Sequence, residues 1–265
     1  MFLTAERSPN IPMPTPMRWG PPPRGGGGGG GGYHVLGVWI PRPIAWLIAA
    51  VLFMSAGGSL LQRAGVPLLS LSILHVAEVW RGEVWRLVTW SLLQLDALGL
   101  IFGCLMLYFI GPDLLRRWGT RRFFVNFFGG AAVVGAVTCV IGQYLWWVVA
   151  AVPHQGLWPM NEAMIIAWAA LFRDRQILMF FALPASGRNL IALTIGITVV
   201  MAALYGFPMF VPHFVAEFVA LLYMDVIPVR SAIARGRLAW FQRGYKRRTA
   251  KLTRVDRDEP PRWTH

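Results

Sequence analysis

Long charge-free stretches are the feature of this sequence that most limits how the chain can fold. Residues 43–61, 123–152 and 189–207 contain no Asp, Glu, Lys or Arg. A charge-free stretch of roughly 18 or more residues can cross the ~30 Å hydrocarbon core of a bilayer as a helix. Because lipid offers no hydrogen-bond partners, every backbone N–H and C=O in such a stretch must be paired within the protein, which favours helices. The mean hydropathy of +0.52 agrees with this interpretation.

Three further apolar segments carry isolated polar residues. Residues 92–110 and 208–227 are long enough to span, and their ionisable residues are Asp96, His213, Glu217 and Asp225. Residues 159–172 carry Asn161 and Glu162 near their start. As a helix this segment would reach only ~20 Å. The sequence therefore predicts an all-α membrane protein, a six-transmembrane-helix bundle with a short central fourth helix. No segment predicts a strand.

The basic residues alternate between the two sides of this predicted bundle. The net charge is +13, and arginines follow the second span (Arg116, Arg117, Arg121, Arg122) and the fourth (Arg173, Arg175, Arg188). The loop between the third and fourth spans, residues 154–158, has no charge. Short cytoplasmic loops are enriched in Lys and Arg. We therefore expect a multi-pass protein with both termini in the cytoplasm, and a bacterial inner membrane as its setting.

Three regions follow from composition. Residues 1–36, with eight consecutive glycines and many prolines, predict a disordered cytoplasmic leader. Residues 37–228 form the membrane domain, and residues 229–265 form a basic cytoplasmic tail that we expect to contact anionic lipid headgroups rather than nucleic acid. The two cysteines, Cys104 and Cys139, lie inside predicted spans and are expected to pack as apolar side chains. No nucleotide, haem or flavin motif is present, so no cofactor is expected.

The segment between the first two predicted spans, residues 63–86, is amphipathic and rich in Val and Leu, and it carries Trp80 and Trp85 with Trp90 nearby. Tryptophan favours the bilayer interface, where its ring is apolar and its N–H stays hydrated. We expect this segment to lie on or partly in the outer leaflet. Trp85 and Arg86 are interpreted as interfacial anchors, with Arg86 paired to loop carbonyls or to Glu83. His75 and His154 are expected to be surface residues of the outer loops.

Four segments resemble the rhomboid family of intramembrane proteases. Residues 82–90 (Gly-Glu-Val-Trp-Arg-Leu-Val-Thr-Trp) are similar to the Trp-Arg segment of the first rhomboid loop, and residues 105–123, with Gly-Pro and Arg-Trp-Gly, resemble the end of the second span. Residues 172–184 resemble the loop after the fourth span, and the histidine and alanines of residues 213–220 resemble the last span. The resemblance covers about residues 43–228 and implies the six-span rhomboid fold.

The resemblance also implies a Ser-His dyad that cuts transmembrane substrates, and several of its residues differ here. The register of residues 158–163 puts Asn161 at the position of the serine, and no Ser, Thr or Cys occurs from 159 to 172. The two positions on the second span that stabilise the oxyanion become Gly99 and Gly103. Only the histidine remains, as His213. An amide is not a nucleophile of the alkoxide or thiolate kind, so the resemblance implies the fold while the residues argue against the reaction.

The other polar residues have structural interpretations. Asn161 and Glu162 are expected to cap the fourth helix and to favour its dipole, and Gly99 with Gly103 is expected to allow close helix packing. His213 and Glu217, one helical turn apart, are expected to form a polar pair that also bonds across to the fourth span, with Asn161 as a candidate partner. A metal site is the least favoured interpretation, since only Asp225, Asp96 and Glu162 could complete one.

Three functions remain in play at this point. The first is a pseudoprotease similar to derlins and inactive rhomboids, which binds the transmembrane segments of client proteins without cutting them. The second is an active rhomboid endopeptidase with another nucleophile, for which Ser91 is a poor candidate. The third is a small transporter or proton relay that uses His213, Glu217 and Asp225, although no inverted repeat or pair of broken helices accompanies these residues.

Overall fold

Helices make up most of the chain that the computed structural model describes, namely residues 31–35, 38–173, 176–179, 183–226 and 242. Three helical segments are long and apolar enough to cross a membrane: Arg42–Arg63, Ala97–Trp118 and Thr120–Leu145. Two shorter apolar helices, Asn189–Tyr205 and Phe207–Tyr223, follow later in the chain. The predicted spans are thus helical, and the helix predicted at 92–110 begins and ends later than expected.

Two of these three long segments combine more than one element. The first consists of α1 (Arg42–Leu52), a π-helical turn η1 (Phe53–Gly57) and α2 (Gly58–Arg63). The second is the uninterrupted α6 (Ala97–Trp118), and the third joins α7 (Thr120–Val140) to the π-helical turn η3 (Ile141–Leu145). The remaining membrane helices are α9 (Trp158–Leu171), α10 (Gly187–Tyr205) and α11 (Phe207–Tyr223). The short helix predicted at 159–172 is therefore α9, which has 14 residues.

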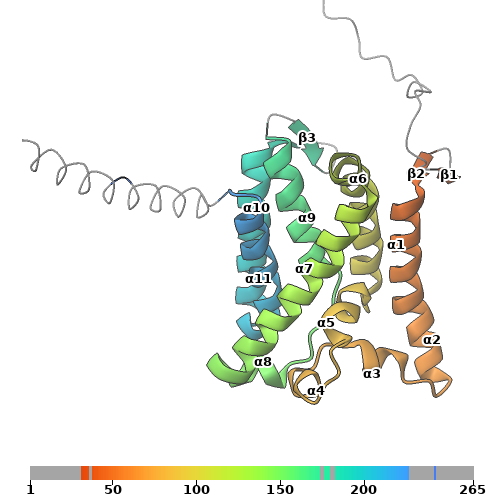
Figure 1. Cartoon of the computed structure of the whole chain (residues 1–265), viewed down its shortest axis with the longest axis vertical. Coiled ribbons are helices and arrows are strands. Elements are labelled where there is room, and N and C mark those ends of the chain that lie inside the picture. The colour runs from red at the N-terminus through yellow and green to blue at the C-terminus, as the bar shows by residue number, and fades with distance from the viewer. Residues whose placement is uncertain (1–30, 36–37, 174–175, 180–182, 227–241, 243–265) are drawn as a thin grey trace, which may run out of the picture. The chain divides into compact units, whose positions relative to one another are not determined.

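The segment between α2 and α6 folds into short helices rather than one amphipathic helix. These are α3 (Leu68–Ser72), α4 (Val76–Trp80), α5 (Arg86–Thr89) and the 3-10 turn η2 (Trp90–Leu92). They gather at the end of the bundle opposite the α6–α7 turn, together with α8 (Trp147–Ala151), as Figure 1 shows.

The absence of strands was a wrong prediction. Two antiparallel hairpins of four-residue strands occur: β1 (Gly32–Val35) with β2 (Val38–Pro41), and β3 (Gln176–Met179) with β4 (Leu183–Ser186). Strands this short are below the length at which alternation becomes visible in a sequence. The hairpin β1–β2 also begins inside the predicted leader of residues 1–36. Residues 1–30 of that leader, and all of the predicted tail except Gln242, lie outside the described residues.

The helix α6 illustrates how one helix serves two environments. Its buried residues lie at intervals of three and four, namely Gly99, Gly103, Leu107, Ile110, Gly111 and Leu114. Its exposed apolar residues follow the same spacing on another face, namely Leu98, Ile101, Phe102, Leu105 and Phe109. A soluble monomer rarely exposes so continuous an apolar face, so this stripe is suited to lipid.

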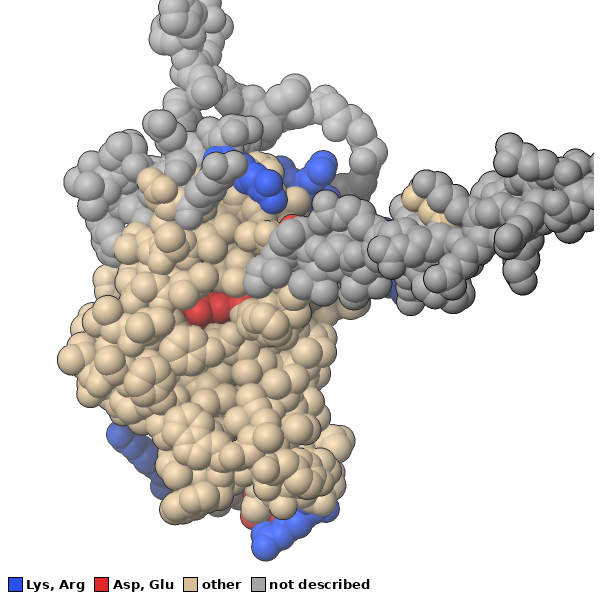
Figure 2. Space-filling view, turned by 90° about the vertical axis from the view of Figure 1, so that its left-hand side faces the viewer, with Lys and Arg blue, Asp and Glu red and all other residues tan. Residues whose placement is uncertain are grey.

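Lys and Arg side chains are absent from the middle of the bundle surface on the face that Figure 2 shows. In Figure 2, Lys and Arg side chains gather near both ends of the described helices, with a broad uncharged face between them that one acidic patch interrupts. This distribution matches the sequence analysis, which placed arginine-rich turns at the ends of the spans.

The central helix α9 is held by its neighbours on several sides. It packs against α6, α10 and α11, and most of its side chains are buried. The indole Nε1 of Trp168 donates to Asp113 Oδ2 of α6 over 2.9 Å, which fixes one end. A 14-residue helix is too short to cross a bilayer alone. The surrounding helices enclose α9, so its first turn lies inside the bundle and not at its surface. That first turn carries the residues of the candidate site.

Candidate functional site at the start of the short helix

The start of α9 is positioned by the side chain of Gln94. Its amide Oε1 accepts from the backbone N of Leu157 over 3.1 Å, and its Nε2 donates to Asp96 Oδ2. The backbone N of Gln94 donates to Ser55 Oγ over 2.9 Å. Asp96 in turn accepts from the backbone N of Gly99 and caps α6. Three segments of the chain therefore meet at Gln94, through its side-chain amide and its backbone N–H. Asp96 lies at the start of α6, where it satisfies the N–H of Gly99.

The loop that leads into α9 is also held tightly. His154 is buried, and its backbone exchanges hydrogen bonds with that of Leu74, at N···O distances of 2.9 and 3.0 Å. Its ring Nε2 donates to the carbonyl of Val149 over 3.0 Å. Burial lowers the pKa of His154 below its usual value, because desolvation disfavours the charged imidazolium. The prediction that His154 is a surface residue was wrong, since neighbouring loops cover it.

Asn161 does not cap α9. The N-cap position is Leu157, with no side-chain capping bond, and Asn161 lies inside the helix, where it is 1% exposed. Its Nδ2 donates to the carbonyl of Gly103 on α6 over 3.2 Å, while its Oδ1 is buried without a partner among the described residues. The start of α9 lies close to α6 here. A Cβ added at Gly103 would be only 2.9 Å from Leu157 Cδ2.

His213 is paired with Glu162 rather than with Glu217. Its Nδ1 lies 2.8 Å from Glu162 Oε2 and 3.0 Å from Oε1. A carboxylate oxygen accepts, so Nδ1 is the donor in this pair. The other ring nitrogen, Nε2, takes no part in it. The ring of Phe210, one turn earlier on α11, lies 4.9 Å away between centroids and further fixes the imidazole. The structure thus brings α9 and α11 together through a residue for which the sequence suggested a cap.

Glu217 serves another helix. Its Oε1 accepts from Thr198 Oγ1 of α10 over 2.8 Å. Asp225 lies past the end of α11, exposed, with a φ of 54°. The three residues of the predicted relay therefore have separate surroundings, and Glu217 is bonded away from His213 although both lie on one face of the helix. Among the described residues, no group of three His, Cys, Asp or Glu side chains could hold a metal ion.

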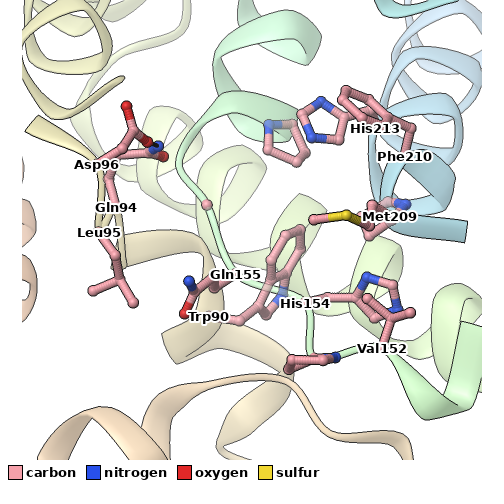
Figure 3. A pocket seen from close by; sticks show the side chains of 14 residues that line it. Trp90, Gln94, Leu95, Asp96, Val152, His154, Gln155, Met209, Phe210 and His213 are labelled. Atoms are coloured by element: carbon pink, nitrogen blue, oxygen red, sulfur yellow. Dashed lines mark hydrogen bonds between the residues drawn. The ribbon is translucent and has the colours of Figure 1, made fainter. Parts of the chain in front are cut away.

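A cavity of about 570 Å³ opens beside His213. Figure 3 shows Gln94 and Asp96 on one side and His213, Phe210 and Met209 on the other. The cavity is further lined by Trp90, Leu95, Val152, Pro153, His154, Gln155, Gly156, Pro159 and Pro212. None of these described lining residues is a Ser, Thr, Cys, Tyr or Lys. Ser91 is fully buried and donates to the carbonyl of Val88 over 2.8 Å, outside this cavity.

Arg86 holds the outer loops together from within. Its Nε donates to Glu83 Oε2 over 2.6 Å, and its Nη1 donates to the carbonyls of Ser70 and Ile73. These partners are the ones that the sequence suggested, but the side chain is only 4% exposed. The predicted pairing of Arg86 is therefore confirmed, and its role as an interfacial anchor stays a prediction. Trp85 is half exposed, and its indole Nε1 donates to the carbonyl of Leu71.

Comparison with known proteins gives one family. The family model described as the Rhomboid domain matches residues 81–227, which is more than half of the chain. This region contains α9, α11 and the whole contact between Asn161, Glu162, Gly103 and His213. A search of curated proteins finds no match.

Proposed function

This chain belongs to the rhomboid family, and on that basis we propose that it is a pseudoprotease that binds transmembrane segments of client proteins without cutting them. The observation that carries the proposal is the cavity beside His213, in which no described lining residue offers a hydroxyl, a thiol or an amine as nucleophile. A histidine base acts on a nucleophile within hydrogen-bond reach. The nearest carboxylate, that of Glu162, occupies the Nδ1 side of the ring.

The positions that would stabilise a tetrahedral intermediate also lack side-chain donors. Gly99 and Gly103 have no side chain, and the carbonyl of Gly103 already accepts from Asn161. Loss of one oxyanion donor typically lowers kcat by about 10²–10³-fold. The site therefore lacks a nucleophile and both side-chain oxyanion donors. All three absences argue against acyl transfer and for binding without cleavage.

Lateral access supports a membrane-embedded ligand. The helices α6 and α10 both pack against α9 but scarcely touch each other, whereas α10 and α11 pack closely. We propose that a client helix enters from the lipid between α6 and α10 and reaches the cavity at the start of α9, where Pro159 lines it. The orientation that we propose puts the arginine-rich α6–α7 turn in the cytoplasm with both termini, in a bacterial inner membrane, and leaves the cavity near the outer face. Anionic headgroups would contact the basic tail.

The test is reconstitution of the full chain in liposomes with a panel of single-span substrates. We expect no cleavage products, and a photo-crosslinking residue at Met209, which lines the cavity, should capture a client segment. The same probe at Trp46, an exposed residue of α1, is the matched control and should capture none. Cleavage that disappears in His213→Ala would overturn the proposal.

One observation favours a hydrolytic alternative. A carboxylate on Nδ1 is also how a triad orients its histidine, and Glu162 makes that contact here. In this case the nucleophile would come from a residue other than Asn161. A serine-reactive fluorophosphonate probe separates the two functions, because covalent labelling of the folded protein supports the hydrolase and its absence supports the pseudoprotease.

A further inference from the structure

A second cavity, of about 320 Å³, lies between α7, α9 and α11 and shares no lining residue with the cavity at His213. Each helix contributes small residues to its wall, namely Gly129, Gly130, Ala163, Ala167, Ala216 and Ala220. Because these residues are small, a groove remains where larger side chains would fill the space. A Cβ built at Gly129 would meet nothing within 4 Å, so the groove is open at that position.

One end of this groove is polar. The hydroxyl of Tyr223 donates to Asn126 Oδ1 over 3.2 Å, and both residues line the groove. The Nδ2 of Asn126 is buried and has no hydrogen-bond partner among the described residues. An unpaired donor is costly in an apolar wall, so an acceptor brought by a ligand at this end of the groove would satisfy the amide.

The polar end continues into a cluster of arginines. Arg122, Asn126, Gly129 and Val133 follow at spacings of four, three and four residues, which puts them on one face of α7. From Asn126 to Val133 the groove runs for roughly 10 Å at 1.5 Å per residue. Arg122 is exposed and makes no ion pair or hydrogen bond with a described residue. Arg117 and Arg121 near the same turn are also exposed and have no ion pair with a described residue. The described carboxylates at this end are those of Asp225 after α11 and of Asp113, which pairs with Arg116.

We propose that this groove binds an anionic phospholipid, with one acyl chain between α7, α9 and α11 and the phosphate at Arg122 and Asn126. The occupant must be apolar along the groove and must carry an anionic acceptor at one end, and a phospholipid has both parts in that order. A client helix, about 10–12 Å wide with its side chains, is too thick for a groove of this volume. An inorganic phosphate lacks the apolar part.

The test is native mass spectrometry of the full chain purified in detergent and titrated with phosphatidylglycerol. We expect Gly129→Leu, which fills the groove, and Arg122→Gln, which removes the cation, each to weaken retention of the lipid by about fivefold or more. The matched controls are Gly196→Leu, at a lipid-facing glycine of α10 with equal open space, and Arg116→Gln, whose guanidinium pairs with Asp113. Both should retain the lipid as the wild type does.

Further arms separate the possible occupants. Phosphatidylcholine with the same acyl chains should bind more weakly, and inorganic phosphate should not displace the bound lipid. A phosphatidylglycerol with a photoreactive acyl chain should label peptides from residues 125–133 or 216–224 in the wild-type protein, which tests the site without any substitution. Equal retention in Gly129→Leu and Gly196→Leu, or labelling confined to other helices, would overturn the proposal.

Discussion

Asn161 and Glu162 are sequence neighbours on α9, yet they serve different helices. Asn161 reaches α6 at Gly103, and Glu162 reaches α11 at His213. Residues one apart on a helix point about 100° away from each other, so one short helix can join two neighbours through adjacent positions. The sequence could not reveal this, because Asn and Glu near a helix start are more often caps, and the partners lie 58 and 51 residues away.

Glu162→Gln tests whether the pairing with His213 stabilises the fold. We expect a lower midpoint of thermal unfolding in detergent, equivalent to ~1–2 kcal/mol, because a neutral amide replaces a charged acceptor. Glu78→Gln, which removes an acid whose partner Arg81 is largely exposed, should change stability by less than ~1 kcal/mol. Equal unfolding midpoints for the two variants would show that the pairing contributes nothing.

His154 gives the protein a pH dependence with a defined sign. Because burial lowers its pKa in the folded state, the unfolded chain binds a proton more readily. Burial of the neutral imidazole therefore costs no stability to protonation above the unfolded-state pKa of ~6.5. As the pH falls below that value, the free energy of unfolding decreases. Thermal unfolding measured from neutral to mildly acidic pH should show a smaller decline in His154→Gln than in wild type. His75→Gln, in the neighbouring loop, should decline as wild type does.

The short helices between α2 and α6 depend on one buried guanidinium. Arg86 bonds Glu83 and two loop carbonyls, so Arg86→Ala leaves three acceptors without their donor. We expect a loss of ~3 kcal/mol or more in stability and faster limited proteolysis between residues 63 and 96. Arg81→Ala, at an exposed pair, should leave both measurements near wild type. A proteolysis rate unchanged in Arg86→Ala would contradict this role.

The crossing of α6 and α9 depends on the missing side chain at Gly103. Gly103→Val should lower stability by ~1–3 kcal/mol, because the new atoms overlap Leu157 and displace Asn161. Gly196→Val, which has open space on α10, is the matched control for the change in helix propensity. Chemical denaturation in mixed micelles measures both variants, and equal free energies of unfolding would argue against close packing at this crossing.

How far an element could be predicted depended on whether its signal is local. The spans follow from uninterrupted apolar sequence, which is a local property, and the structure has helices there. Helical spacing predicted a pair between His213 and Glu217. In the structure Glu217 instead accepts a hydrogen bond from Thr198 of the neighbouring helix α10. The second cavity had no local signal, since its small residues come from three separate helices. The site could be assigned to the right helices, but its contacts could not.

The orientation of the bundle in the membrane is a prediction about the whole molecule. In a background without Cys104 and Cys139, Gln155→Cys in the charge-free loop should react with a membrane-impermeant maleimide added to intact cells. Arg121→Cys, in the arginine-rich turn, should react only after the membrane is permeabilised. Both positions are exposed, so a difference in labelling reports the side of the membrane. Labelling of Arg121→Cys in intact cells would reverse the orientation.

Gln94 joins three parts of the chain, because its backbone N–H donates to Ser55 and its side-chain amide contacts Asp96 and Leu157. It therefore connects the starts of α6 and α9 with each other and with the middle of the first span. If its side chain turned away, the starts of α6 and α9 would lose their shared support, while the bond from the Gln94 backbone to Ser55 in the first span would remain. Gln94 also lines the cavity beside His213, so widening of this cavity and loosening of the starts of α6 and α9 are one event rather than two.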